Sequence, residues 1–335
     1  MANILLLATG GTIAARESGQ GLTPMLSSED ILHYVSGMEK NHHITCQNIL
    51  NLDSSNIQAE EWVLIARDIA ARLVEYDGII ITHGTDTMAY TAAILSFMLQ
   101  NLTKAVILTG AQIPIDNPLS DARENLHTAF AAIDSGLYGV YIAFNRKVIR
   151  GCRGVKVRTM GMEAFESVNA PYAAEVYADG LKVYGPIRRD LTEVKPLLLR
   201  DRISTDVFLL KLIPGTNPDI FDALHGLGYR GIVLETFGVG GLHYIRRDLL
   251  AKLKELREAG ISIVACSQCL YETSDFSLYE VGQRLLECGI IPGRDMTTEA
   301  AVTKLMWALG QTDDSTVVQQ IFDTNYVGEV TLPYE

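Results

Sequence analysis

Short apolar runs that alternate with amphipathic segments constrain the fold of this chain more than any other feature. In the first half, five runs read as strands: 4–8, 45–50, 79–82, 105–109 and 140–144. Segments 60–75 and 87–99 between them carry apolar side chains at helical spacing. Strands that alternate with helices predict a doubly wound, mostly parallel sheet with helices on both faces.

The same alternation resumes in the second half, after a charged stretch marked by prolines. Strands are expected at 207–212, 231–235 and 261–265, and helices at 219–227, 248–259 and 299–309. The sequence therefore predicts an α/β fold of two domains. A larger N-terminal domain over 1–184 is joined by a linker over 185–204 to a smaller C-terminal α/β domain over 205–335.

Charge and composition exclude several classes of function. The 335 residues carry a formal net charge of −12, from 28 basic and 40 acidic side chains. Nonspecific binding to nucleic acid or to an anionic membrane needs a basic surface, so neither is expected. No stretch approaches the ~20 apolar residues of a membrane span. The start of the chain does not resemble a secretory leader, and five cysteines are an odd number, so reduced thiols in a cytoplasm are expected.

Two threonine-rich turns stand directly after strand-like runs. They are residues 9–12 (Thr-Gly-Gly-Thr) and 83–87 (His-Gly-Thr-Asp-Thr). Ligands of an open α/β sheet bind at the carboxyl ends of its strands, where glycines let the backbone approach a ligand closely. A phosphate-binding turn would need a lysine at Walker spacing, which these turns lack. The pattern favours hydroxyl chemistry on a small polar substrate.

Other strand ends supply partners for these hydroxyls. Residues 53–55 (Asp-Ser-Ser) follow one strand, and residues 110–112 (Gly-Ala-Gln) follow another. Lys156 lies among glycines rather than on a solvated helix face. A threonine hydroxyl needs a base, and a desolvated lysine oriented by a carboxylate can serve. Thr85, Asp86 and Lys156 could form such a relay, although each alone could equally be a helix cap or a surface charge.

These motifs resemble those of the bacterial-type L-asparaginases, amidohydrolases that convert L-asparagine and water to L-aspartate and ammonia. Residues 9–14 resemble the first active-site signature of that family, and residues 83–88 resemble the second. The resemblance runs along nearly the whole chain, through 108–114 and 293–297. Residues 53–55 and the missing leader are most similar to the cytoplasmic type I branch.

The resemblance implies roles for the reacting groups. Thr12 would attack the side-chain amide carbon and form a β-aspartyl ester. Thr85, with Lys156 and Asp86, would move protons and help to activate the hydrolytic water. Which threonine attacks first stays open at this point.

The resemblance also implies substrate contacts. Asp53 and Ser54 would hold the α-amino and α-carboxylate groups of asparagine, and Asp86 would also meet the α-amino group. Ala111 would contribute backbone contacts near the amide. No metal or organic cofactor is implied, and the family assembles as homodimers or homotetramers.

Three positions depart from the family pattern. Residues 16–26 are expected to form a mobile flap, or else a passive surface hairpin, and Leu22 stands where many relatives carry a catalytic tyrosine. Val155 and Glu235 stand where some type I relatives bind a second, allosteric asparagine through a threonine and an arginine. A carboxylate cannot grip a substrate carboxylate, so no asparagine-driven cooperativity is expected. Residues 238–241 lack an asparagine of the dual glutaminase-asparaginases, which favours asparagine as substrate.

Two further motifs have plainer interpretations. Cys266 and Cys269 have C-x-x-C spacing, but a structural zinc site needs a second pair that the other cysteines do not offer. Packed thiols are expected there, with a redox role as the alternative. His42 and His43 lie in a polar segment and are expected to be solvated.

Two other functions compete with an asparaginase. The asparaginase-like subunit of a tRNA-dependent amidotransferase resembles this chain, but it carries an extra N-terminal domain and would need to meet tRNA. A ligand-binding sensor that has lost turnover is the alternative outside enzymes. The presence of Thr12, Thr85, Asp86 and Lys156 argues against the sensor.

Overall fold

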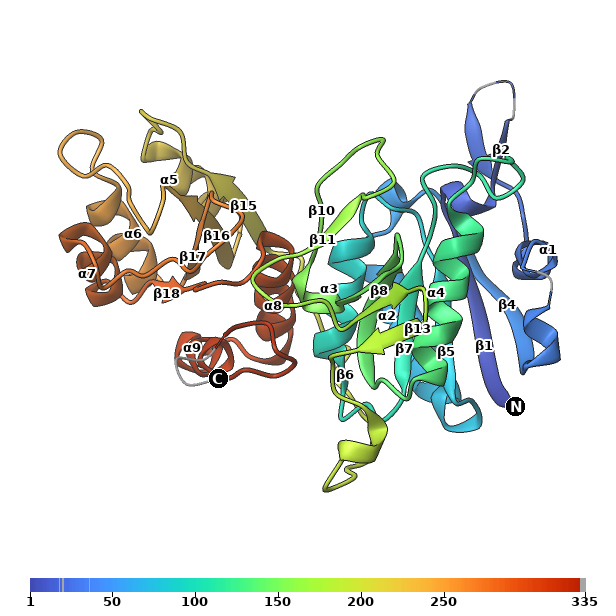
Figure 1. Cartoon of the computed structure of the whole chain (residues 1–335). Helices are drawn as coiled ribbons and strands as arrows, with labels where there is room; N and C mark the ends of the chain where they lie inside the picture. Colours follow the sequence, from blue (N-terminus) through green and yellow to red (C-terminus); the bar gives the residue numbers. More distant parts are fainter. Residues whose placement is uncertain (18, 20, 36, 332–335) are drawn as a thin grey trace. The chain divides into compact units, whose positions relative to one another are not determined.

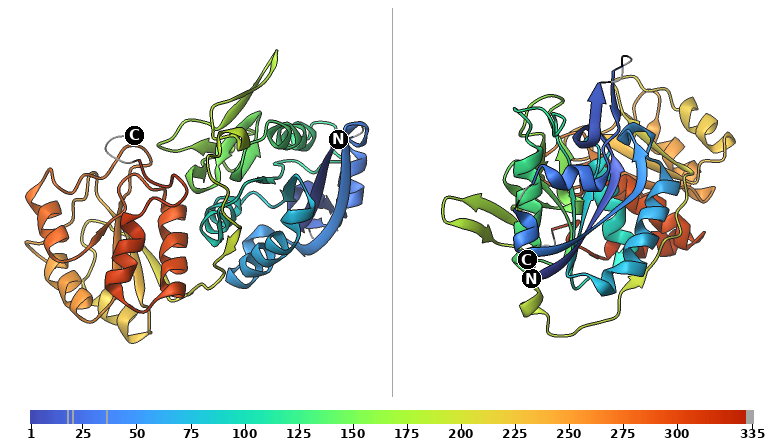
Figure 2. Two further views of the ribbon diagram at one scale, coloured as in Figure 1. Left: turned by 90° about the horizontal axis from the view of Figure 1, so that it is seen from below. Right: turned by 90° about the vertical axis from the view of Figure 1, so that its right-hand side faces the viewer.

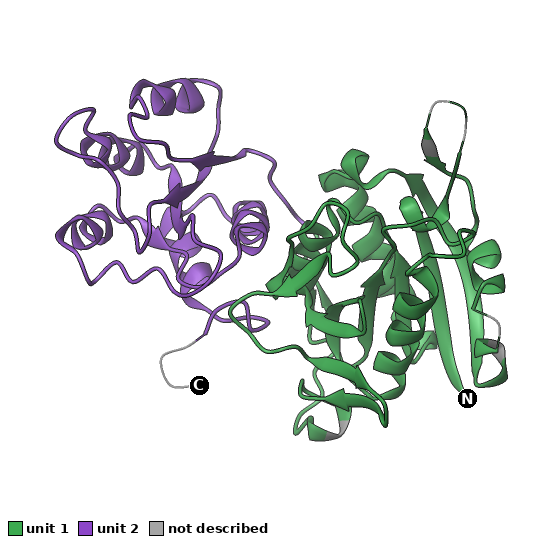
Figure 3. Ribbon diagram, turned by 45° about the horizontal axis from the view of Figure 1, so that its top comes forward, with its two compact units in different colours: residues 1–201 green, residues 202–335 purple. Residues whose placement is uncertain are grey.

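The chain folds into two compact units. The structure, a computed structural model, describes residues 1–331 apart from residues 18, 20 and 36. Unit 1 comprises residues 1–201 and unit 2 comprises residues 202–335 (Figure 3). The mixed α/β architecture predicted from the sequence is confirmed, with the larger sheet in unit 1 and a separate, smaller parallel sheet in unit 2.

Unit 1 is built on a sheet that, in the described residues, has eight strands (Figure 1). Five neighbouring strands are parallel, and three antiparallel strands extend one edge. In spatial order the strands are β13 (Gly180–Val183), β12 (Ala174–Tyr177), β9 (Lys147–Arg150), β8 (Gly139–Phe144), β7 (Ala105–Thr109), β5 (Gly78–Thr82), β1 (Ala2–Gly10) and β4 (His42–Leu52).

Helices bury both faces of this sheet. On one face, Ile4 and Leu6 of β1 share a core with Leu126 and Phe130 of α4 and with Ile31 of α1. α2 and α3 pack together on the opposite side of the sheet (Figure 2). Alternate residues of a strand point to opposite faces, so the central strands β5 and β7 are buried at every position. The helices are α1 (Ser28–His33), α2 (Ala59–Arg72), α3 (Met88–Met98) and α4 (Ala122–Asp134).

The described part of unit 1 also contains three small two-stranded sheets. They pair β2 (Ala15–Glu17) with β3 (Leu22–Pro24), β10 (Gly154–Lys156) with β11 (Phe165–Ser167), and β6 (Leu99–Gln100) with β14 (Leu198–Leu199). The hairpin of β12 and β13 projects beyond the rest of unit 1 in both views of Figure 2.

Through residue 331, unit 2 has four parallel strands in sequential order, with its core between the sheet and its helices. The strands are β15 (Val207–Lys211), β16 (Gly231–Thr236), β17 (Ser262–Ser267) and β18 (Ile291–Pro292). The helices are α5 (Asp219–Gly226), α6 (Leu249–Glu258), α7 (Glu280–Glu287), α8 (Thr298–Gln311) and α9 (Ser315–Asp323). Thr297 caps α8, because its hydroxyl accepts a hydrogen bond from the amide of Ala300.

The stretch that the sequence predicts as a linker, 185–204, contacts unit 1 along most of its length. The amide of Arg188 donates to the carbonyl of Gly136, and Leu198 and Leu199 pair with β6. The boundary between the two units therefore falls between residues 201 and 202.

His43 is exposed, as expected, but the expectation that His42 is solvated is wrong. The ring of His42 is buried, with Nδ1 3.1 Å from the carbonyl oxygen of Met38 and Nε2 3.0 Å from a carboxylate oxygen of Asp134. A period-two strand places one residue of such a pair inside, so β4 buries the first histidine and exposes the second.

A buried ion pair joins α8 to the segment that follows α9. Lys304 and Glu329 are both fully buried, with Nζ 2.5 Å from Oε1. Glu329 also accepts hydrogen bonds from the amides of Tyr326 and Val327. Lys304 further donates to the carbonyl of Thr324. These additional bonds satisfy the groups that burial removes from water, which a buried pair requires.

Substituting Glu329→Gln should destabilise unit 2 strongly, because it leaves the Lys304 ammonium buried without a counter-charge. The expected loss in the free energy of unfolding is about 3 to 5 kcal/mol, measured by urea denaturation. The matched control is Asp313→Asn, which breaks the exposed Arg230–Asp313 pair and should change stability far less. Equal losses in the two variants would contradict this assignment.

Candidate functional site

The carboxyl ends of β1, β4, β5 and β7 meet at one edge of the unit 1 sheet, and their loops touch. A Cβ atom added to Gly11 would lie 2.3 Å from the amide nitrogen of Gly84, and one added to Gly84 would lie 2.6 Å from Oγ of Ser54. A Cβ added to Gly110 would lie 2.3 Å from the carbonyl oxygen of His83. No side chain fits at these three glycines, so the four loops pack closely against one another.

Hydrogen bonds lock these loops together. The hydroxyl of Thr9 donates to the carbonyl of Thr82 at 2.8 Å, which joins the ends of β1 and β5. The hydroxyl of Thr87 donates to the carbonyl of Ser54 at 2.7 Å. The amide of Gly11, at a φ of 81°, donates to the carbonyl of Leu52 at 2.9 Å. The two threonine-rich turns and the 53–55 loop therefore form one connected surface.

Thr85, Asp86 and Lys156 form the polar cluster that the sequence predicts. Lys156 Nζ lies 2.8 Å from Oγ1 of Thr85 and 2.5 Å from Oδ1 of Asp86. The lysine side chain is only 16% exposed, whereas the aspartate side chain is 62% exposed. The amine is thus withdrawn from solvent and held between a hydroxyl and a carboxylate, an arrangement suited to moving a proton.

A separate two-stranded sheet delivers Lys156 to this cluster. Lys156 is the last residue of β10, where it pairs with Phe165 of β11. The preceding turn packs closely on α3, because a Cβ added to Gly151 would lie 2.9 Å from the carbonyl oxygen of Ala92. α3 begins directly after the turn that carries Thr85, so one helix positions both the hydroxyl and the amine.

The other predicted site residues lie around the same edge. Thr12 is half-buried and opens a 3₁₀ turn directly after Gly11, which contacts Gly84. Ser54 is buried against Gly84, and Asp53 is exposed, with its carboxylate accepting from the amide of Ser55 at 2.8 Å. Ala111 is fully buried in the loop after β7.

A chain of buried side chains supports the Thr85 turn from behind. Nδ1 of His83 lies 2.7 Å from the carbonyl oxygen of Gly84, which can only accept, so Nδ1 carries the proton. Nε2 then accepts from the hydroxyl of Thr91 at 3.0 Å, and that hydroxyl accepts from Nε1 of Trp62 at 3.0 Å. Burial lowers the pKa of the His83 imidazole from 6.5 to about 4, so the ring is neutral near pH 7.

Gln112 follows this strand in the sequence, but no motif predicts a role for it. In the structure it lies against the cluster. Its Oε1 lies 3.2 Å from Oγ1 of Thr85. The only sequence signal was its position directly after Ala111 at the end of β7. The contact itself depends on tertiary packing.

Two short strands, one near each end of the segment predicted as a flap, pair as a hairpin. β2 and β3 pair in antiparallel fashion from Ala15 with Pro24 to Glu17 with Leu22. Residues 18 and 20 and the side chain of Leu22 lie outside the described part of the structure. The hairpin is anchored beside the first threonine-rich turn, because the amide of Met25 donates to the carbonyl of Ala14.

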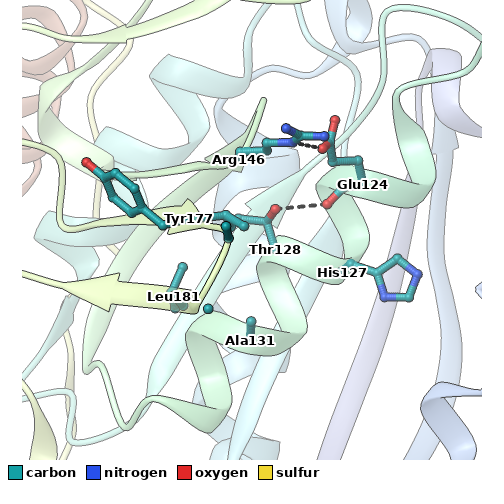
Figure 4. A pocket seen from close by; sticks show the side chains of 10 residues that line it. Glu124, His127, Thr128, Ala131, Arg146, Tyr177 and Leu181 are labelled. Carbon is teal, nitrogen blue, oxygen red and sulfur yellow. Dashed lines mark hydrogen bonds and ion pairs between the residues drawn. The ribbon is translucent and has the colours of Figure 1, made fainter.

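Unit 1 also holds a hollow of about 750 Å³ between α4 and the β12–β13 hairpin (Figure 4). Small and apolar side chains such as Ala131, Val176 and Leu181 line much of it. Its two charged side chains, Glu124 and Arg146, pair with each other. Because few free polar groups converge there, the hollow is a weaker candidate for a site than the cluster around Thr85.

The described residues contain no group of three or more histidines, cysteines or acids that could hold a metal ion. Within those residues no cysteine forms a disulfide, and Cys266 is buried whereas Cys269 is exposed. Burial raises the pKa of the Cys266 thiol to about 12, with a smaller contribution from nearby Glu235. None of the described helices combines the length and hydrophobicity that a bilayer crossing requires.

Both units match known family models. Residues 3–189 match the N-terminal asparaginase domain, and residues 206–322 match the C-terminal domain of glutaminases and asparaginases.

Individual relatives cover almost the whole chain. It is 43% identical to an L-asparaginase of Thermococcus kodakarensis over 98% of this chain and 99% of the relative. A solved structure of L-asparaginase I from Vibrio cholerae is 32% identical, with a TM-score of 0.88 over 99% of each chain. A glutamyl-tRNA(Gln) amidotransferase subunit of Pyrococcus furiosus is 36% identical over 99% of this chain and 77% of the relative.

The neutral state of His83 should make stability depend on pH. The folded protein binds fewer protons at this ring than the unfolded chain, so the free energy of unfolding falls as the pH drops from 6.5 to about 4. The protonation of this ring should account for about 3 kcal/mol of that fall in the free energy of unfolding. It is measured as the difference in urea-derived stability between pH 7.5 and pH 4, compared between wild type and His83→Gln.

At pH 7.5 the two proteins should differ only by the contacts that the substitution removes, so that measurement serves as the control. An equally steep acid loss in His83→Gln would show that the ring is not the group responsible.

Proposed function

The chain belongs to the asparaginase family, and from that premise we propose that it hydrolyses the side-chain amide of L-asparagine to L-aspartate and ammonia. The observation that carries the proposal is the contact of Lys156 with both Thr85 and Asp86, beside a second turn that presents Thr12. Hydroxyls, an amine and a carboxylate at one sheet edge are the groups that acyl transfer through a threonine ester requires.

In the proposed reaction, Oγ1 of Thr12 attacks the amide carbon of the substrate. The new C–O bond gives a tetrahedral intermediate, and the proton lost by the Thr12 hydroxyl is passed to the amide nitrogen. The C–N bond then breaks and ammonia leaves. Water then attacks the β-aspartyl ester, which releases aspartate and restores the Thr12 hydroxyl. Backbone amides at the glycine turns are suited to stabilising the oxyanion of each tetrahedral intermediate.

Thr85, Lys156 and Asp86 handle the protons in this scheme. The amine of Lys156 exchanges a proton through the hydroxyl of Thr85, and the carboxylate of Asp86 orients the amine. The partial burial of Lys156 supports this role, because its amine is held against Thr85 and Asp86. No metal or organic cofactor enters the scheme.

The substrate's charged groups would meet the loops around the cluster. Asp53 and Asp86 offer exposed carboxylates for the α-ammonium group, and Ser54 offers a hydroxyl for the α-carboxylate. Ala111 contributes its backbone near the amide. The close packing of the 53–55 loop on Gly84 supports a substrate that spans the two loops.

We further propose that the protein works in the cytoplasm as a homodimer or homotetramer. The odd number of cysteines, five, with no disulfide among the described residues, supports a reducing compartment. The oligomer follows from the family resemblance alone, and size-exclusion chromatography with light scattering tests it.

The similarity to an amidotransferase subunit favours a second candidate, in which ammonia is released only for a partner enzyme acting on tRNA. The net charge of −12 favours the free-standing hydrolase, because tRNA requires a basic surface. Steady ammonia release by the isolated protein without tRNA would support the hydrolase. Asparagine binding without turnover would instead indicate a sensor.

The Thr12→Ala and Thr85→Ala variants should each lose at least ~10³-fold in the rate of ammonia release from L-asparagine. Thr12→Ala removes the attacking oxygen, and Thr85→Ala breaks the proton path to Lys156. The assay is ammonia release under saturating L-asparagine, with L-glutamine as the comparison substrate, which should be the slower of the two.

The matched control is Thr128→Ala, which removes a threonine hydroxyl bonded within α4 and should leave turnover near that of wild type. Near-normal rates in both the Thr12 and the Thr85 variants would refute the threonine mechanism. Loss in only one of them would identify which hydroxyl is indispensable.

The rate should rise hyperbolically with asparagine concentration, with a Hill coefficient of about 1. Glu235 is already engaged within unit 2, by the hydroxyl of Thr298 at 2.7 Å and by Lys211 at 3.5 Å. A carboxylate there repels the carboxylate of a second asparagine rather than binding it. A clearly sigmoidal curve in steady-state kinetics would contradict this expectation.

A further inference from the structure

Gln112 makes contacts with three parts of unit 1 through its backbone and its side chain. The backbone amide of Gln112 donates to both carboxylate oxygens of Asp121, at 3.0 and 3.1 Å, and the amide of Ile113 donates to the same carboxylate at 3.2 Å. Asn125 of α4 donates to that carboxylate and to the carbonyl of Gly110, both at 3.0 Å. The start of α4 therefore holds the backbone of the 110–113 turn in place.

The side-chain amide of Gln112 has only one acceptable orientation. Its Nε2 lies 3.2 Å from the carbonyl oxygen of Thr159 and 3.1 Å from that of Gly161. Both partners are acceptors, so the NH₂ group must face them, because a flipped amide would place oxygen against oxygen. Oε1 is then committed to the opposite side, where it lies 3.2 Å from Oγ1 of Thr85.

This orientation settles the direction of the hydroxyl proton of Thr85. A lysine ammonium can only donate, so Oγ1 of Thr85 accepts from Lys156 at 2.8 Å. The hydroxyl's own proton is left to point at Oε1 of Gln112, which is an acceptor. The hydroxyl is thus held between one donor and one acceptor, and its rotation is fixed before a substrate arrives.

We propose that Gln112 is a positioning residue for the reaction, acting through the hydroxyl of Thr85. The inference rests on the proposed function, since it assigns Gln112 a task in the proton path described above. Gln112 keeps a lone pair of Thr85 facing Lys156 and ties the 159–161 loop to the reacting groups. Preorganised hydroxyls cost no reorganisation during the reaction, which is why losing the acceptor should slow turnover.

Replacing Gln112→Met removes the acceptor and the two donors while keeping a side chain of similar length. Turnover of asparagine should fall about 10- to 100-fold, the range expected when a partly buried hydroxyl loses its partner. KM should stay within about threefold of the wild-type value, because Gln112 is assigned no contact with the substrate. Wild-type turnover in a folded Gln112→Met protein would overturn the proposal.

A second variant separates positioning from general damage to the fold. In a Thr85→Val background the hydroxyl is already absent, so adding Gln112→Met should lower the residual turnover by less than about twofold. If turnover in the double variant is 10-fold or more below that of Thr85→Val alone, the assignment is overturned. Gln311→Met is the matched control, because its amide also bridges two carbonyl oxygens but lies in unit 2. It should retain wild-type turnover.

The contact is also testable without asparagine turnover. If Gln112 and Thr85 are bonded as described, the shifts in the urea midpoint caused by Gln112→Met and Thr85→Val should not add in the double variant. A wild-type protein that releases no ammonia would defeat the proposed function, while non-additive midpoints would still support the Gln112–Thr85 contact. Additive midpoints would overturn that contact whatever the activity.

Discussion

The site depends on the packing of one backbone turn against another, where Gly11 meets Gly84 without room for a single carbon atom between them. The turn after β1 and the turn after β5 are held at that distance by their strands, which are hydrogen-bonded neighbours in the sheet. A methyl group at Gly11 would push the two threonine-bearing turns apart, and one at Gly84 would collide with Ser54. The sheet therefore defines the spacing of the reacting groups, and the loops contribute the chemistry.

Around this contact, the hydroxyl of Thr85 and the carbonyl of Gly84 have hydrogen-bond partners of the right kind. A donor and an acceptor flank its hydroxyl, and a neutral histidine supports its backbone from the protein interior. Networks in which each member is satisfied are rigid. They are costly to break because a buried group that loses its partner cannot hydrogen-bond to water instead. Rigidity at this point suits a reaction that needs a weak nucleophile and a proton path to be aligned in advance.

Sequence patterns predict the parts of this structure that local physics determines. The runs ending at Ala8, Thr82 and Thr109 are apolar apart from the threonines that end two of them, which is typical of central parallel strands, and the structure extends or confirms each one. The Lys156–Asp86 contact followed from the chemistry of the residue types. The antiparallel edge formed by β9, β12 and β13 was not predicted, because short strands with mixed faces resemble loops until their partners are known.

Two other features show where sequence reasoning ends. The two-residue pairing of Leu198 and Leu199 with β6 has no periodicity to detect, so the stretch reads as a linker. Gln112 is an unremarkable residue by type, and its role arises only because Thr159 and Gly161 turn its amide toward Thr85. Contacts of this kind depend on the tertiary arrangement rather than on any local pattern.

The distribution of the thiols has a practical consequence. Cys152 and Cys266 are buried, and the high pKa of Cys266 leaves almost no thiolate there to react. Cys46 and Cys288 are half-covered, and Cys269 is the exposed cysteine. A maleimide dye should therefore attach first at Cys269, in the loop after β17, which gives unit 2 a fluorescent reporter without any engineered residue.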